Sequence, residues 1–152
     1  ACAMTGLPVD FRDTDNGALS RLFQEIAAQD LLPECRVLGY VSGGEMQQLL
    51  RSATLLIQPS LFEGWNTTVQ DAKALGCPLL VSDIPIHREQ APSAEAFFDP
   101  YDPESLADAL KGHFALLPPR PDREKEKLSL EREKRFATEH GARAAGIFLE
   151  TP

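Results

Sequence analysis

The chain has 152 residues, with 23 acidic and 15 basic side chains and a formal net charge of −8 at pH 7. This length suits one domain with a substantial core, and the acidic surface argues against nucleic acid or an anionic membrane as the main partner. No apolar run approaches the length of a membrane span, and we expect no signal peptide. Three scattered cysteines indicate neither a disulfide framework nor a zinc site. We therefore expect a cytoplasmic protein.

Strand and helix patterns alternate along the chain, which is typical of an α/β fold with a parallel sheet and helices on both faces. The sequence predicts five strands: within 1–5, and over 35–40, 54–57, 79–81 and, more weakly, 96–98. Asn16 and Gly17 open a helix between the first two strands, and the capping-box pair Ser42 and Glu45 begins the next helix. A second capping-box pair, Thr67 and Gln70, precedes the strand over 79–81, and a last helix starts at Asp102-Pro103-Glu104.

Prolines at positions 118, 119 and 121 then interrupt the chain. They predict a boundary near residue 120, between an α/β domain over 1–120 and a helical extension over 121–152. The charge-dense segment 123–135 predicts a solvated helix or a partly disordered segment, and its charges predict a solvent face. A closing helix is expected over 136–149.

The run from Pro59 to Pro78 carries the most chemical information in the sequence. It joins a short apolar strand to a helix through a loop with a carboxylate, a glycine and several small polar residues. Glu63 stands just before the helix N-terminus, where free N–H groups can hold an anion, and Asp71 follows inside the helix. Amides suit a phosphate and carboxylates accept hydrogen bonds from hydroxyls, so the pattern predicts a site for a ligand with both groups.

This run resembles the donor-binding signature of retaining glycosyltransferases with the GT-B architecture, especially family 4. The signature reads Pro-Ser-x-x-Glu-Gly, continues to a second acid after seven intervening residues, and ends in Ala-x-Gly-x-Pro, here residues 74–78. The resemblance extends from about residue 38 to about residue 110 and implies the Rossmann-like C-terminal half of a GT-B fold. The sequence differs from the family at Asp71, where Glu is usual and reaches about 1.5 Å further.

The resemblance implies roles for individual residues. Glu63 would face the donor sugar and stabilise the reacting centre without being a nucleophile. The other implied donor-binding residues are Ser60, Gly64, Trp65, Asn66, Thr67 and Thr68 in the loop and helix start, Asp71 at the ribose, and Tyr40 and Val41 at the base. Simpler structural interpretations remain open: Glu63 as a carboxylate that stabilises the helix dipole, the loop as an ordinary turn, Trp65 packed beneath the loop, and Tyr40 as a buried tyrosine.

The three histidines are interpreted as structural or exposed. His87 begins the segment His87-Arg88-Glu89-Gln90, which resembles a short arginine–glutamate turn of the same family and is interpreted as a helix start with an internal ion pair. His113 lies among apolar helical positions, and His140 lies near the C-terminal end.

The expected function is the donor-binding domain of a retaining glycosyltransferase, which transfers a sugar from a nucleoside diphosphate sugar to a hydroxyl acceptor without a cofactor or a protein-held metal. The basic diphosphate-binding pair and the N-terminal acceptor domain of such enzymes are missing here, so the fragment is expected to be inactive alone. The alternatives are a GT-B nucleotide-sugar epimerase or hydrolase, and a non-catalytic sugar-nucleotide-binding or interaction module. The base, the sugar and the acceptor stay undetermined.

Overall fold

The computed structural model describes residues 2–5, 18–117 and 120–149, and it divides into two compact units, residues 1–46 and 47–152, which are described separately. In the first unit, β1 (Cys2–Thr5) and β2 (Cys35–Gly39) pair in parallel, with Cys2 opposite Cys35. Helix α1 spans Ala18–Ala28. Both predicted strands are therefore confirmed, and the predicted helix opener at 16–17 lies outside the described residues.

Helix α2 (Gly43–Ser52) begins with the predicted capping box. The Glu45 carboxylate accepts hydrogen bonds from the Ser42 N–H and the Ser42 hydroxyl, each at 2.7 Å, and the Glu45 N–H donates back to Ser42 Oγ at 3.3 Å. These bonds hold the pKa of the Glu45 carboxyl below its ordinary value, because they favour the ionised form.

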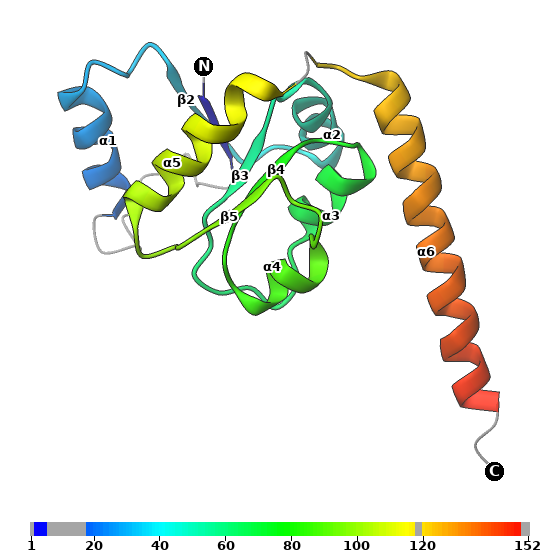
Figure 1. Ribbon diagram of the computed structural model, residues 1–152. Coiled ribbons are helices and arrows are strands. Elements are labelled where there is room, and N and C mark those ends of the chain that lie inside the picture. Colours follow the sequence, from blue (N-terminus) through cyan, green and yellow to red (C-terminus); the bar gives the residue numbers. More distant parts are fainter. Residues whose placement is uncertain (1, 6–17, 118–119, 150–152) are drawn as a thin grey trace. The chain divides into compact units, whose positions relative to one another are not determined.

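The second unit contains a three-stranded parallel sheet in the order β3–β4–β5 (Figure 1). The strands are β3 (Leu56–Gln58), β4 (Leu79–Ser82) and β5 (Ala96–Phe98). All four residues of β4 are buried, as expected for the central strand of a sheet with covered faces. Helix α3 (Thr67–Ala74) follows β3 and contributes the buried Val69 and Ala72 to the core. The predicted α/β fold is confirmed.

Two further helices follow β4 and β5. Helix α4 (Pro85–Gln90) follows β4, and α5 (Pro103–His113), which continues into a 3₁₀ turn over Phe114–Leu116, follows β5. Asp102 caps α5 as predicted, because its Oδ1 accepts the Glu104 N–H at 3.0 Å. The second predicted capping box is wrong: the N-cap of α3 is Asn66, whose side chain accepts the Val69 N–H, and the Gln70 side chain bonds elsewhere.

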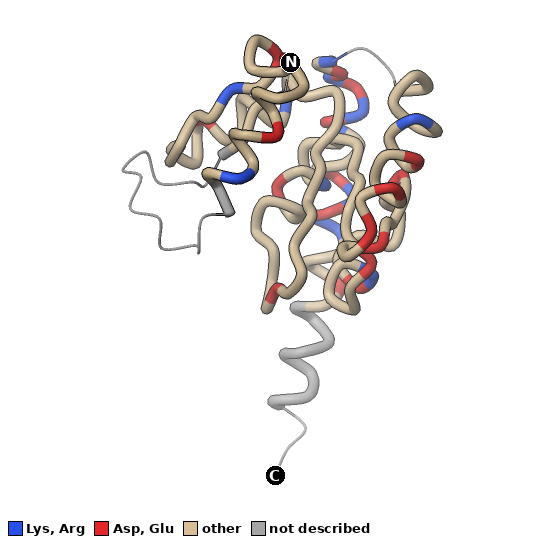
Figure 2. The backbone as a smooth tube through the Cα atoms, turned by 90° about the vertical axis from the view of Figure 1, so that its left-hand side faces the viewer, with Lys and Arg blue, Asp and Glu red and all other residues tan. Residues whose placement is uncertain are grey.

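Helix α6 (Arg123–Leu149) runs beside α3 and unites the two segments predicted after residue 121. Basic and acidic residues are interleaved along its described part (Figure 2). The predicted solvent face is wrong for two of these charges. Glu126 is buried and pairs with Arg51 at 2.7 Å, and Glu133 accepts a hydrogen bond from Gln70 at 2.6 Å and pairs with Lys73 at 3.5 Å. The partners come from α2 and α3, so the charge pattern of α6 alone does not reveal them.

Arg120, just before α6, bonds to the ends of two helices. Its guanidinium donates to the Gly76 carbonyl at 3.0 Å and to the Leu75 carbonyl at 3.1 Å, beyond the C-terminus of α3, and reaches the Leu50 carbonyl of α2 at 3.5 Å. A cation at this position satisfies carbonyls that have no partner within their own helices.

Replacing Arg120 with methionine is expected to lower the free energy of unfolding by about 2 kcal/mol, because charge-assisted bonds to partly buried carbonyls are lost. Urea unfolding followed by circular dichroism measures the change. Lys111→Met is the control: it removes an exposed ion pair with Asp108 and should change stability by less than about 0.5 kcal/mol. Equal effects of the two substitutions would contradict the role given to Arg120.

Candidate functional site

The signature loop, residues 59–66, lies at the carboxyl end of β3, the edge at which ligands bind in open α/β sheets. Glu63 is the centre of its hydrogen-bond network. Its Oε1 accepts bonds from Ser60 Oγ at 2.6 Å, from Asn66 Nδ2 at 2.9 Å and, more weakly, from Gln58 Nε2 at 3.4 Å. Among the described residues all hydrogen bonds of this carboxylate reach Oε1, which leaves Oε2 available to a ligand.

Strand β4 anchors the loop at Ser60, near the end of β3. Ser82 Oγ donates to the Ser60 carbonyl at 2.5 Å, and His87 Nδ1 lies 3.0 Å from both Ser82 Oγ and the Ser82 carbonyl. Since the serine hydroxyl already donates to Ser60, an N–H at His87 Nδ1 would satisfy both of these oxygens. His87 is fully buried, in agreement with the structural interpretation of this residue. The ion pair of this segment is not internal as predicted: Arg88 pairs with Asp83, which precedes α4.

The start of α3 has both paired and open N–H groups. Asn66 is 5% exposed; its Oδ1 accepts the Val69 N–H at 2.9 Å, and its own N–H donates to Gln90 Oε1 at 3.1 Å. The Asn66 N–H is therefore not offered to a ligand in this structure, in contrast to the sequence-based expectation. Thr67 and Thr68, the first two helical residues, have no partner for their N–H groups within the described chain, as is usual in the first turn.

A cavity of about 260 Å³ lies beside the loop at the same edge of the sheet. Its lining residues follow the three strands: Leu61 after β3, Asp83 and Ile84 after β4, and Asp99, Pro100 and Tyr101 after β5. Glu63 is not among them. Arg88 donates two hydrogen bonds to Asp83, at 2.6 and 2.7 Å, which keep the pKa of that carboxyl below its ordinary value. Two carboxylates, Asp83 and Asp99, therefore line the cavity at the carboxyl ends of the strands.

The remaining predicted residues differ in exposure. Trp65 is 54% exposed, so the packed alternative for this ring is wrong in this structure. A Cβ at Gly64 would meet nothing within 4 Å, so the backbone there is open to close approach. Asp71 is exposed on α3. Tyr40 is 80% exposed, which contradicts the buried-tyrosine alternative, and Val41 is half-buried; both belong to the first unit and are described with it alone.

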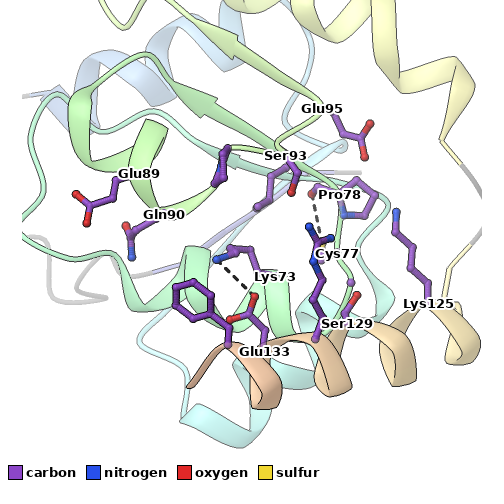
Figure 3. A pocket seen from close by; sticks show the side chains of 15 residues that line it. Lys73, Cys77, Pro78, Glu89, Gln90, Ser93, Glu95, Lys125, Ser129 and Glu133 are labelled. Carbon is purple, nitrogen blue, oxygen red and sulfur yellow. Dashed lines mark hydrogen bonds and ion pairs between the residues drawn. The ribbon is translucent and has the colours of Figure 1, made fainter. Parts of the chain in front are cut away.

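A larger cavity, of about 400 Å³, lies at the amino ends of β4 and β5 and is also lined by residues of α3, α4 and α6 (Figure 3). The Lys73–Glu133 ion pair of α3 and α6 forms part of its wall, together with Cys77 and Pro78. Burial raises the pKa of the Cys77 thiol, so this cysteine is a weak nucleophile. We assign the candidate site to the carboxyl edge, because the carboxylate and the open N–H groups gather there.

The sequence did not single out three polar residues that hold the loop: Gln58, Ser82 and Gln90. Each stands at the end of a strand or helix, and only the fold brings it next to residues 60–66. Within the described residues no group of three or more His, Cys, Asp or Glu side chains is placed to hold a metal ion, and no helix is long and apolar enough to cross a membrane.

Comparison with known proteins assigns the chain to a family. The model of the glycosyl transferases group 1 family matches residues 4–116, and the chain belongs to this family. It is 31% identical over 90 residues to the O-antigen chain mannosyltransferase RfbU of Salmonella typhimurium, a match that covers 59% of this chain and 26% of the relative. The chain thus spans about a quarter of the length of that relative.

A solved structure is similar in fold. The sucrose-phosphate synthase of Thermosynechococcus elongatus superposes with a TM-score of 0.69 at 16% sequence identity, over 98% of this chain and 39% of that one. This likeness agrees with the Rossmann-like, GT-B-type fold predicted from the sequence. At such low identity it carries no information about substrate.

Proposed function

We propose that this chain is the donor-binding domain of a retaining glycosyltransferase that transfers a sugar from a nucleoside diphosphate sugar to a hydroxyl acceptor. The observation that carries the proposal is the Glu63 carboxylate, held through one oxygen at the carboxyl edge of the sheet and followed by the open N–H groups of Thr67 and Thr68. Membership of the glycosyl transferases group 1 family supports the same reaction class.

In this proposal each part of the site acts on a different part of the donor. The N–H groups at the start of α3 bind the diphosphate, whose negative charge is favoured at a helix N-terminus. Glu63 Oε2 accepts hydrogen bonds from the sugar hydroxyls and stabilises the positive charge that develops at the anomeric carbon. Asp71 contacts the ribose, and the sequence-based assignment of Tyr40 and Val41 to the base stays a prediction. No metal ion is held by the protein, and the acceptor is bound outside this chain.

We expect the intact protein that contains this chain to bind one class of nucleotide sugar. Isothermal titration calorimetry and thermal shift against UDP-glucose, GDP-mannose and ADP-glucose measure this binding, and a ligand present at 100 times its Kd should add about 2.7 kcal/mol of stability. GDP-mannose is included because RfbU is a mannosyltransferase. Product analysis with a labelled donor separates transfer from hydrolysis or epimerisation. Absence of binding to all three donors would contradict the proposal.

A further inference from the structure

Gln90 forms a two-point bond with the backbone of the signature loop. It is the last residue of α4 and only 2% exposed. Its Oε1 accepts the Asn66 N–H at 3.1 Å, and its Nε2 donates to the Asn66 carbonyl at 3.2 Å. Only an amide in this orientation satisfies both groups, because a carboxylate lacks the donor and an apolar side chain lacks both.

Asn66 connects Gln90 to Glu63, the candidate catalytic group. Its Nδ2 donates to Glu63 Oε1 at 2.9 Å, while its Oδ1 caps α3 through the Val69 N–H. The two ends of the Asn66 amide therefore have different partners, which excludes the flipped orientation. A chain of hydrogen bonds runs from Gln90 through Asn66 to Glu63, and it is distinct from the contact between Ser60 and the same carboxylate.

We propose that Gln90 is a positioning residue for the donor sugar: it holds Asn66, and through Asn66 it fixes the direction in which Glu63 Oε2 faces the sugar hydroxyls. This inference rests on the proposed function. It gives Gln90 no contact with the donor, so its removal should affect recognition of the sugar and leave recognition of the diphosphate unchanged. The large cavity that Gln90 also lines has no part in this role, since the Gln90 amide is bonded to Asn66.

The test uses the intact protein and two ligand pairs, GDP with GDP-mannose and UDP with UDP-glucose. Calorimetry gives a sugar ratio for the pair that binds: the Kd of the nucleoside diphosphate divided by the Kd of its nucleotide sugar. Gln90→Met is expected to lower this ratio about fivefold. It should leave the Kd of the nucleoside diphosphate within about twofold, because the bonds of Gln90 go to Asn66 and not to Thr67 or Thr68, whose N–H groups bind the diphosphate in the proposed function. Glu63→Gln should lower the ratio at least as much.

The double variant distinguishes positioning from general damage. In a Glu63→Gln background, Gln90→Met should lower the sugar ratio no further, because both substitutions remove the same interaction. Leu50→Ala, at a buried position of α2 outside this chain of bonds, is the control for lost stability and should leave the ratio unchanged. If Gln90→Met fails to fold, Gln90→Asn replaces it, since its amide ends about 1.5 Å short of Asn66.

The outcomes separate the two proposals. If Glu63→Gln leaves the sugar ratio unchanged, the proposed role of Glu63 fails and the positioning role fails with it. If Glu63→Gln lowers the ratio but both Gln90 variants leave it unchanged, only the positioning role is overturned. The positioning role alone is also overturned if Gln90→Met weakens binding of the nucleoside diphosphate as much as binding of the nucleotide sugar. It is likewise overturned if the effects of Glu63→Gln and Gln90→Met on the sugar ratio add in the double variant.

Discussion

Glu63→Gln in the intact enzyme is expected to lower kcat for sugar transfer by about 100- to 1,000-fold, the usual effect of removing one electrostatic contact to a developing charge. The substitution keeps the shape of the side chain. An amide oxygen at the position of Oε1 still accepts bonds from Ser60 and Asn66, so the loop should keep its conformation. The change falls on the other atom, Oε2, where the proposed acceptor of sugar hydroxyls becomes a donor.

Steady-state kinetics with the donor found by calorimetry measures this effect. Thermal unfolding of the Glu63→Gln variant should match that of the wild type, and the Kd of the nucleoside diphosphate should be unchanged. Glu89→Gln is the matched control, because Glu89 is an exposed carboxylate on α4 that lines the larger cavity, and this variant should transfer at the normal rate. Transfer by Glu63→Gln at more than a tenth of the wild-type rate would refute the role of Glu63.

Gly76→Ala is expected to lower the free energy of unfolding by about 2–4 kcal/mol. Gly76 has φ of +63°, a conformation that costs a residue with a Cβ about 1–2 kcal/mol. The added Cβ would also lie 2.9 Å from Ser129 Oγ and 3.1 Å from the Lys125 carbonyl, so α6 would have to shift away from α3.

Urea unfolding followed by circular dichroism checks this prediction. Gly112→Ala provides the control, because Gly112 lies inside α5 and an added Cβ there meets nothing within 4 Å. Alanine should be neutral or slightly stabilising at that position. An unchanged unfolding midpoint for Gly76→Ala would show that the turn after the C-terminus of α3 is not packed against the first turns of α6.

The sequence predicted the strands and the order of the elements well, because local patterns determine them. The strand over 96–98 was predicted to the residue, and Asp102 caps its helix through a bond between near neighbours. Gly76 shows that part of the recognised signature is structural. It lies in a left-handed turn that ends α3, with the Cys77 N–H bonded to the Ala72 carbonyl at 2.8 Å, and this explains a glycine at that point of the motif.

The sequence failed where a bond joins distant segments. Thr67 has the spacing of a helix cap, yet Asn66 takes that role because Gln90, 24 residues away, fixes its backbone. Glu126 belongs to a charge run that suggests a solvated surface, but Arg51, 75 residues away, pairs with it in a buried position. Such partners depend on how helices pack against one another, and no local spacing encodes that packing. The predicted binding residues of the loop remain predictions.

The signature loop has little freedom to rearrange, since β4 holds it at Ser60, and α4 holds it at Asn66. Its loss of conformational entropy accordingly takes place when the polypeptide folds, before any substrate arrives. Under the proposed function, the free protein would then already hold the groups that recognise the sugar ring in their binding positions. Epimers that differ in a single hydroxyl would be distinguished by rigid geometry, with no adaptation of the loop to each of them.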